Sequence, residues 1–289
     1  MSDIQKYLAV WWIRILSFFV LSAFFYMAYS AVAGFTHSVI SYFLPIFFAS
    51  VIIEHLRKES IFYLFGIMIN LSTPKEFVFG LVLALTNIAM IGGVAYFYAD
   101  DISVQLLINS DWYLIFFSTF FAAGFEEFIF RGLLFQAFHE YFGKYISVIV
   151  FALIFALAHR QIESMDSIFF LNLCIAGVLF GLMYLQTKSL WLSISFHFFW
   201  NLLEQVLLGS PVSGHEANVV FIDFNTMNLP ETLFGGYFGI EGGIVATFAL
   251  LLNIVLVLKF ANPSPYISAP LFKRYYAESE LLYQRDKSK

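Results

Sequence analysis

The sequence predicts an all-α membrane protein with about eight transmembrane helices and both termini in the cytoplasm. Of its 289 residues, 61% are hydrophobic and 12% are charged, whereas a soluble domain averages about 25% charged residues. Apolar runs of roughly 17 to 25 residues, the length that a helix needs to cross a bilayer, recur along the chain. Runs such as 106–123 show no regular alternation of apolar and polar residues, unlike the strands of a β-barrel.

Charged or turn-rich segments divide these runs into eight expected spans. The first apolar run is much longer than the core of a signal peptide, so we expect it to be retained as a span. The segment 61–70 is apolar but short, and we place it at the membrane interface. The eight expected spans cover residues 9–34, 38–54, 77–98, 112–140, 145–160, 168–187, 190–208 and 240–260.

The basic residues fall on alternate sides of these spans in a way that predicts orientation. Of the 15 Lys and Arg residues, Arg160 alone falls outside when the N-terminus is cytoplasmic, and Arg131 lies within a span. This asymmetry follows the positive-inside bias and favours an even number of spans. The outer segments carry acidic residues instead, namely Asp100, Asp101, Asp111, Glu216, Asp223 and Glu231.

We expect one integral membrane domain, residues 1–289, with a motif-bearing core at 112–208. The segment 209–238 is expected to be an extracytoplasmic loop, either a lid or a plain connection, and 261–289 a cytoplasmic tail. The single cysteine, Cys174, excludes an intramolecular disulfide framework. The apolar composition predicts contact with the lipid bilayer. The net charge of -5 and the lack of a basic stripe indicate that the protein binds no nucleic acid.

Glu126, Glu127 and Arg131 lie in the run 124–131 of the fourth expected span, where a charged side chain costs at least about 2.5 to 3.5 kcal/mol. Glu127 and Arg131 are four residues apart and share a helix face, so they can form an ion pair. Both a structural and a catalytic role stay open for this pair. Glu126 points about 100° away from Glu127, and a buried carboxyl without a local counter-ion is typical of a general base.

Further polar residues lie in later spans. His159 ends an apolar run, and taken alone it fits a packing residue. His197 and Asn201 share a helix face that Glu204 and Gln205 continue, and such a stripe can simply join neighbouring helices. At about 1.5 Å per residue, the two carboxyls, His159 and Asn201 lie roughly 18 to 21 Å from the cytoplasmic span ends, with His197 about 6 Å shallower. One buried polar site can therefore contain them all.

In chain order these groups read EExxxR, FxxxH and HxxxN, with Phe155 opening the second motif. The set resembles the motifs of the CAAX-protease and bacteriocin-processing (CPBP, Abi-type) family of intramembrane glutamic endopeptidases, over about residues 124–201. The resemblance implies hydrolysis of a peptide bond in a membrane-anchored peptide or protein, prenylated or not, without a cofactor. We expect a multi-pass protein of a cell membrane, and its small soluble parts favour a bacterial plasma membrane.

The resemblance also implies roles for individual residues. Glu126 would activate a water molecule, and His159 would assist it. His197 and Asn201 would stabilise the oxyanion on the scissile carbonyl. The supporting pair would be Glu127 with Arg131.

Three other functions compete with this hypothesis. Glu126, His159 and His197 have ligand types that suit zinc, although Asn201 would be an unusual ligand, and we expect no metal. A non-catalytic scaffold or immunity protein with a polar intramembrane binding site is the main alternative, but it does not need a complete base and oxyanion set. A transporter would be expected to show inverted repeats or broken paired helices, which the sequence does not suggest. The motifs HExxH, GxSG and GxGD of other intramembrane proteases are absent from the sequence.

Overall fold

The computed structural model describes residues 3–34, 39–98, 103–104, 112–159, 167–210, 212, 222–223 and 229–263. In these ranges the elements that connecting segments join are helices, together with the two short strands β1 (Ser103–Val104) and β2 (Ile222–Asp223). The two strands pair antiparallel, with Ser103 opposite Asp223. The expected all-α class is thus confirmed for the part of the chain that is described.

Eight long helices occupy the positions of the eight expected spans. They are α2 (Trp11–Ala33), α3 (Val39–Leu56), α5 (Thr73–Tyr96), α6 (Trp112–Arg131), α7 (Leu133–Ala158), α8 (Ser167–Thr187), α9 (Trp191–Leu208) and α11 (Ile244–Phe260). The short elements are α1 (Asp3–Leu8), α4 (Ile61–Leu64), α10 (Glu231–Phe234) and the 3₁₀ helices η2 (Gly236–Phe238) and η3 (Ile240–Gly242).

Four helical segments are long and apolar enough to cross a membrane. They are Trp11–Ala33, Thr73–Tyr96, Trp112–Ala158 and Ser167–Thr187. Shorter apolar helices run over Ser41–Leu56 and Ile244–Phe260. The chain is therefore a helical membrane protein.

The expected span 112–140 is wrong at its C-terminal end. Helix α6 ends at Arg131, and α7 begins at Leu133 after Gly132, whose ψ of -132° is not helical. A Cβ atom at Gly132 would lie 2.2 Å from the carbonyl oxygen of Phe128, so the bend requires glycine. The apolar run continues through the bend, and hydrophobicity alone could not locate it.

Helix α7 also contains a break. Gly143 has φ 75° and ψ 179°, and therefore interrupts the helix between the two halves of α7. The expected gap between spans, at residues 141–144, coincides with this break. The segment 61–70 forms only the four-residue helix α4, so it adds no ninth long helix.

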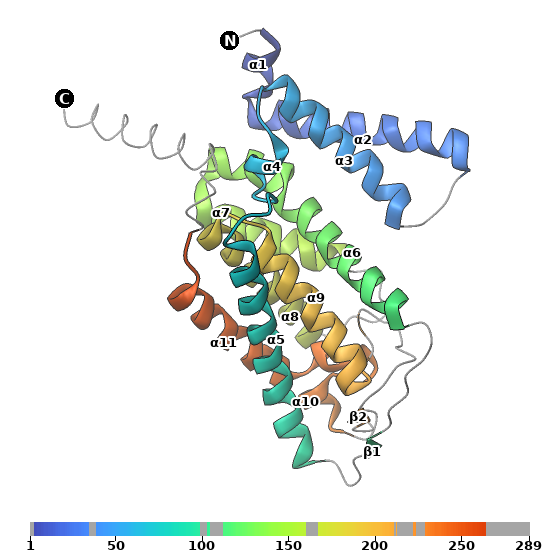
Figure 1. Ribbon diagram of the computed structural model, residues 1–289, viewed down its shortest axis with the longest axis vertical. Coiled ribbons are helices and arrows are strands. Elements are labelled where there is room, and N and C mark those ends of the chain that lie inside the picture. Colours follow the sequence, from blue (N-terminus) through green and yellow to red (C-terminus); the bar gives the residue numbers. More distant parts are fainter. Residues whose placement is uncertain are drawn as a thin grey trace, which may run out of the picture.

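Figure 1 shows α2 and α3 side by side at one end of the molecule, with the other long helices gathered beside them. Helix α9 lies at the centre of that larger group and contacts α5, α6 and α8. Residues 192–198 of α9 are all buried, as expected for a helix that has neighbours on every side. The central position explains why polar side chains on α9 can reach polar side chains on other helices.

Small residues allow the helices around α9 to approach one another closely. A Cβ atom at Gly177 of α8 would lie 2.6 Å from the Cα of Ala152 on α7. A Cβ atom at Gly80 of α5 would lie 2.5 Å from the Oγ of Ser195 on α9. Close backbone contact at small residues is a common way to pack membrane helices. These contacts hold α8 against α7, and α9 against α5, beside the polar residues described next.

Candidate active site

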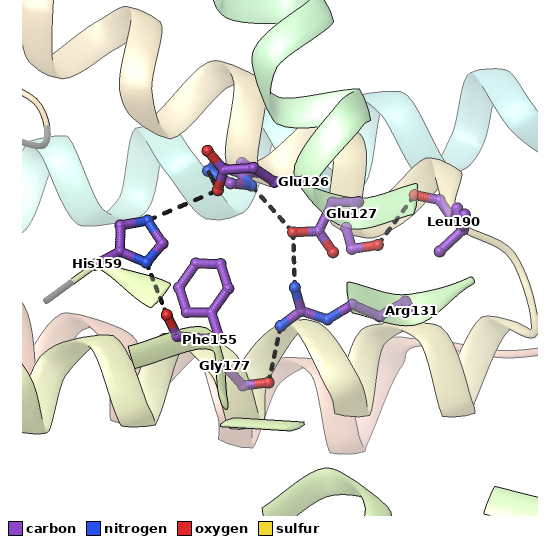
Figure 2. A network of polar contacts seen from close by, with 9 residues as sticks. Glu126, Glu127, Arg131, Phe155, His159, Gly177 and Leu190 are labelled. Atoms are coloured by element: carbon purple, nitrogen blue, oxygen red, sulfur yellow. Dashed lines mark hydrogen bonds and ion pairs between the residues drawn. The ribbon is translucent and has the colours of Figure 1, made fainter. Parts of the chain in front are cut away.

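Glu126, near the C-terminal end of α6, faces histidines from two other helices. Its Oε2 atom lies 3.8 Å from Nε2 of His159, which follows the last residue of α7, and 3.9 Å from Nε2 of His197 on α9. The Glu126 side chain is 35% exposed, against 15% for His159 and 8% for His197. Figure 2 shows Glu126 directed toward His159. The most accessible group of this cluster is thus the carboxylate.

Glu127 and Arg131 form the expected pair, and it is completely buried. Nη1 of Arg131 lies 3.2 Å from Oε1 of Glu127, and both side chains are 0% exposed. The same Glu127 oxygen lies 3.0 Å from Nδ1 of His197. Nη2 of Arg131 donates to the carbonyl oxygen of Gly177 at 3.1 Å, as Figure 2 also shows. This pair therefore connects α6 with α8 and α9 and fixes the imidazole of His197.

Aromatic rings complete the surroundings of the buried guanidinium. The Cζ atom of Arg131 lies 4.9 Å from the ring centroid of Phe180 and 5.1 Å from that of Phe155. Cation–π contacts of this kind stabilise a desolvated cation.

Hydrogen bonds indicate which ring nitrogens carry protons. Nδ1 of His159 lies 2.8 Å from the carbonyl oxygen of Phe155, and Nδ1 of His197 lies 3.0 Å from the carboxylate of Glu127. A carbonyl or carboxylate oxygen only accepts, so each Nδ1 is assigned as the donor. In a neutral ring, Nε2 is then an acceptor, and both Nε2 atoms face Glu126. Direct hydrogen bonds are excluded at 3.8 and 3.9 Å, but a water molecule can donate to these acceptors.

The structure brings the four candidate catalytic residues to one cavity. Glu126, His159, His197 and Asn201 all line it, and its space for water is about 40 Å³. A cavity needs roughly 10 to 15 Å³ on this measure to hold one water molecule. The site can therefore hold the water that hydrolysis requires. The expected depth of the two carboxyls assumed a continuous helix from 112 to 140, so that reckoning was wrong although the residues do meet.

Sequence reasoning missed three polar residues of the same cavity: Asn172, Trp200 and Glu241. The Trp200 Nε1 atom donates to Oε1 of Glu241 at 3.1 Å. Asn172 Nδ2 donates to the carbonyl oxygens of Glu241 and Gly243 at 2.7 and 2.9 Å. Asn172 stands alone in an apolar run and could have been noticed, whereas Glu241 lies in a glycine-rich turn far from the motifs.

Within the described ranges, no three His, Cys, Asp or Glu side chains are placed to hold a metal ion. The expectation of a metal-independent site stays a prediction.

The described residues thus form a helical membrane protein in which one carboxylate, two histidines and an asparagine line a single cavity. Residues 108–203 match the family described as type II CAAX prenyl endopeptidase Rce1-like. This segment is a domain of that CPBP family, which confirms the resemblance indicated by the three motifs. The match includes the four cavity residues and the supporting pair, but not Glu241. No curated protein matches the chain.

Proposed function

We propose that this protein is an intramembrane endopeptidase that hydrolyses a peptide bond of a membrane-associated protein or peptide. The proposal depends chiefly on one observation, the convergence of Glu126 with His159 and His197 at 3.8 and 3.9 Å. Their position in a cavity that can hold water adds to its support. A water molecule at this point would contact a general base and lie beside donors for the substrate carbonyl.

Glu126 acts as the general base in this mechanism. It takes a proton from water while the water oxygen attacks the scissile carbonyl carbon. His159 helps to orient that water through Nε2, because its Nδ1 is already bonded to the carbonyl of Phe155. When the tetrahedral intermediate breaks down, the proton held by Glu126 passes to the leaving amine. No side chain has to form a covalent intermediate.

His197 and Asn201 provide the oxyanion site. The amide of Asn201 can donate directly, and such a donor typically contributes about 10²- to 10³-fold to kcat. His197 can donate through Nε2 only as an imidazolium, since Nδ1 is engaged with Glu127 at 3.0 Å. The buried Glu127 carboxylate would hold that cation in place. Arg131 in turn fixes Glu127, so this pair acts by positioning His197.

The placement in the membrane is part of the proposal. The eight long helices are assigned as eight spans with both termini in the cytoplasm, because the basic residues are distributed in that way. The segment 209–238 is then outside the membrane and 261–289 inside the cell. We assign the protein to a bacterial plasma membrane.

The test compares cells that express wild-type protein or Glu126→Gln at matched levels. New N-termini in membrane proteins, mapped by mass spectrometry, should be present with wild type and lost with the variant. Glu231→Gln is the matched control, since Glu231 is exposed on α10 outside the cavity. New N-termini that persist with Glu126→Gln would refute the role of Glu126. An identical set of N-termini with and without the wild-type protein would favour a non-catalytic scaffold.

A further inference from the structure

A second cavity lies where four helices of the described chain begin or end. It is lined by the first turn of α5, the last residue of α8, Leu192 in the first turn of α9, and residues 260–263 at the end of α11. None of its described lining residues also lines the cavity of Glu126. Its volume is about 680 Å³, within the range of roughly 300 to 1,000 Å³ that is common for ligand sites. The molecule therefore has space for a ligand away from the candidate active site.

The helix ends around this second cavity place it at the membrane surface. The segments Thr73–Tyr96 and Ser167–Thr187 are long and apolar enough to cross a membrane, and a shorter apolar helix ends at Phe260. One end of each lies at the cavity, since Lys75, Thr187 and Phe260 all line it. The hydrocarbon region gives way to lipid headgroups where such helices end. This position holds for either orientation of the protein in the membrane.

Two adjacent residues of α5 give the second cavity one carboxylate and one cation. Glu76 is 8% exposed, and the hydroxyl of Ser189 and the backbone N–H of Leu192 fix its carboxyl. Its Oε2 atom has no hydrogen-bond partner among the described residues, and rotation of the carboxyl about its soft terminal torsion can turn this oxygen to the cavity. Lys75 is exposed and points about 100° away from Glu76 around the helix. The two charges can thus bind two different groups of one ligand.

The remaining wall of the second cavity is largely apolar. It includes Leu71, Phe79, Leu192 and Phe260, of which Leu71 and Phe260 are 73% and 54% exposed. Phe79 lies about 6 Å deeper than Lys75 along α5, at 1.5 Å per residue. A fitting ligand therefore has a charged end with both signs and an apolar remainder.

We propose that this second cavity binds a phospholipid whose headgroup contains a phosphate and a primary ammonium, as in phosphatidylethanolamine. The ammonium donates to the carboxylate of Glu76. The phosphate pairs with Lys75 at the N-terminal end of α5, where the helix dipole also favours an anion. The acyl chains lie against Phe79 and Phe260. A choline headgroup has no N–H to donate, and a glycerol headgroup has no cation for Glu76, so both bind more weakly.

The experiment measures lipid binding to the purified, delipidated full-length protein in detergent by native mass spectrometry. The lipids have identical acyl chains and differ only in the headgroup: ethanolamine, its N-methylated derivatives up to choline, and glycerol. Wild type should bind the ethanolamine lipid about tenfold or more tightly than the choline lipid, as a charge-assisted hydrogen bond predicts. Affinity should fall along the methylation series, because each methyl group removes a donor.

Three variants assign the two charges. Glu76→Gln keeps an acceptor for Ser189 and Leu192 but removes the charge, and should lower the ratio of ethanolamine to choline binding several-fold. Lys75→Gln should weaken the binding of both lipids and keep their ratio, because both contain the phosphate. Lys259→Gln is the matched control, since Lys259 is exposed near the end of α11 but does not line the cavity. It should leave both affinities unchanged.

Equal binding of the ethanolamine and choline lipids by wild type overturns the proposal, and this comparison holds even if Glu76→Gln fails to fold. A preference that a folded Glu76→Gln leaves unchanged overturns it as well. Tighter binding of the glycerol lipid would indicate a simple anion site at Lys75. Displacement of bound lipid by soluble phosphoethanolamine would assign the site to the free headgroup instead of a lipid. None of these measurements depends on cleavage, so the proposed endopeptidase function and the lipid site can fail separately.

Discussion

Arg131→Leu should destabilise the protein because it leaves a buried carboxylate without its counter-ion. Arg131 and Glu127 are both 0% exposed and lie 3.2 Å apart. Removing one partner of a buried ion pair costs about 3 to 5 kcal/mol, since the remaining charge is desolvated and uncompensated. The carbonyl of Gly177 also loses its 3.1 Å donor. Glu127→Gln should have a cost in the same range, because it leaves the buried guanidinium of Arg131 without its carboxylate.

The double variant Glu127→Gln with Arg131→Leu provides the decisive comparison. It contains no buried charge at this point, and replacing both members of a buried pair is often close to neutral. The unsatisfied Gly177 carbonyl still costs about 1 to 3 kcal/mol. The double variant should therefore be more stable than either single variant. It should remain weakly active, because His197 has lost the carboxylate that fixes it.

Stability would be measured by reversible SDS unfolding in mixed micelles, with cleavage of the same substrate measured at matched protein levels. A single Arg131→Leu variant with wild-type stability would show that the pair does not support the fold. A double variant less stable than both single variants would show that the ion pair itself, and not the removal of an unpaired charge, dominates the energetics.

Further outcomes are expected at other positions. Glu126→Gln should abolish cleavage with little change in unfolding free energy, and a variant that retains turnover would refute its role as the base. Asn201→Ala should lower kcat about 10²- to 10³-fold, with an unchanged unfolding midpoint as the check on its fold. Cleavage should resist EDTA and 1,10-phenanthroline, whereas a loss that zinc restores would indicate a metal site. Arg14→Leu should destabilise the protein more than Lys6→Leu, because Arg14 is buried against Glu140 at 2.7 Å, whereas removing Lys6 from its exposed pair should cost less than about 1 kcal/mol.

The helix faces shared by the motif residues were predictable because they depend on local geometry. Glu127 with Arg131, and His197 with Asn201, are separated by four residues, which places each pair on one helix face. The direction of Glu126, about 100° from Glu127, follows from the same periodicity. Only the meeting of three helices had to be inferred, and the shared depth of the polar groups was a weak guide to it.

Contacts between distant segments could not be read from the sequence in the same way. Arg14 and Arg57 were assigned to the cytoplasmic side as basic residues, yet they are 0% and 8% exposed. Both contact Glu140, at 2.7 and 3.4 Å, and Arg57 also pairs with Glu54 at 2.6 Å. This network links α2 and α3 to α7. Positive-inside counting records the side of the membrane on which a charge lies and contains no information on its partners.

Adjacent carboxylates on α6 have opposite surroundings, and this difference gives the site its chemistry. Arg131 lies one turn after Glu127 and neutralises it, and both are buried. The turn of the helix directs Glu126 away from that guanidinium, toward a cavity with space for water. Glu127 orients His197 from behind through Nδ1, so that Nε2 faces Glu126. One turn of helix thus supplies a fixed anion and a water-accessible base on opposite sides of the same imidazole. A single carboxylate could not serve both purposes, because a counter-ion strong enough to fix it would also weaken it as a base.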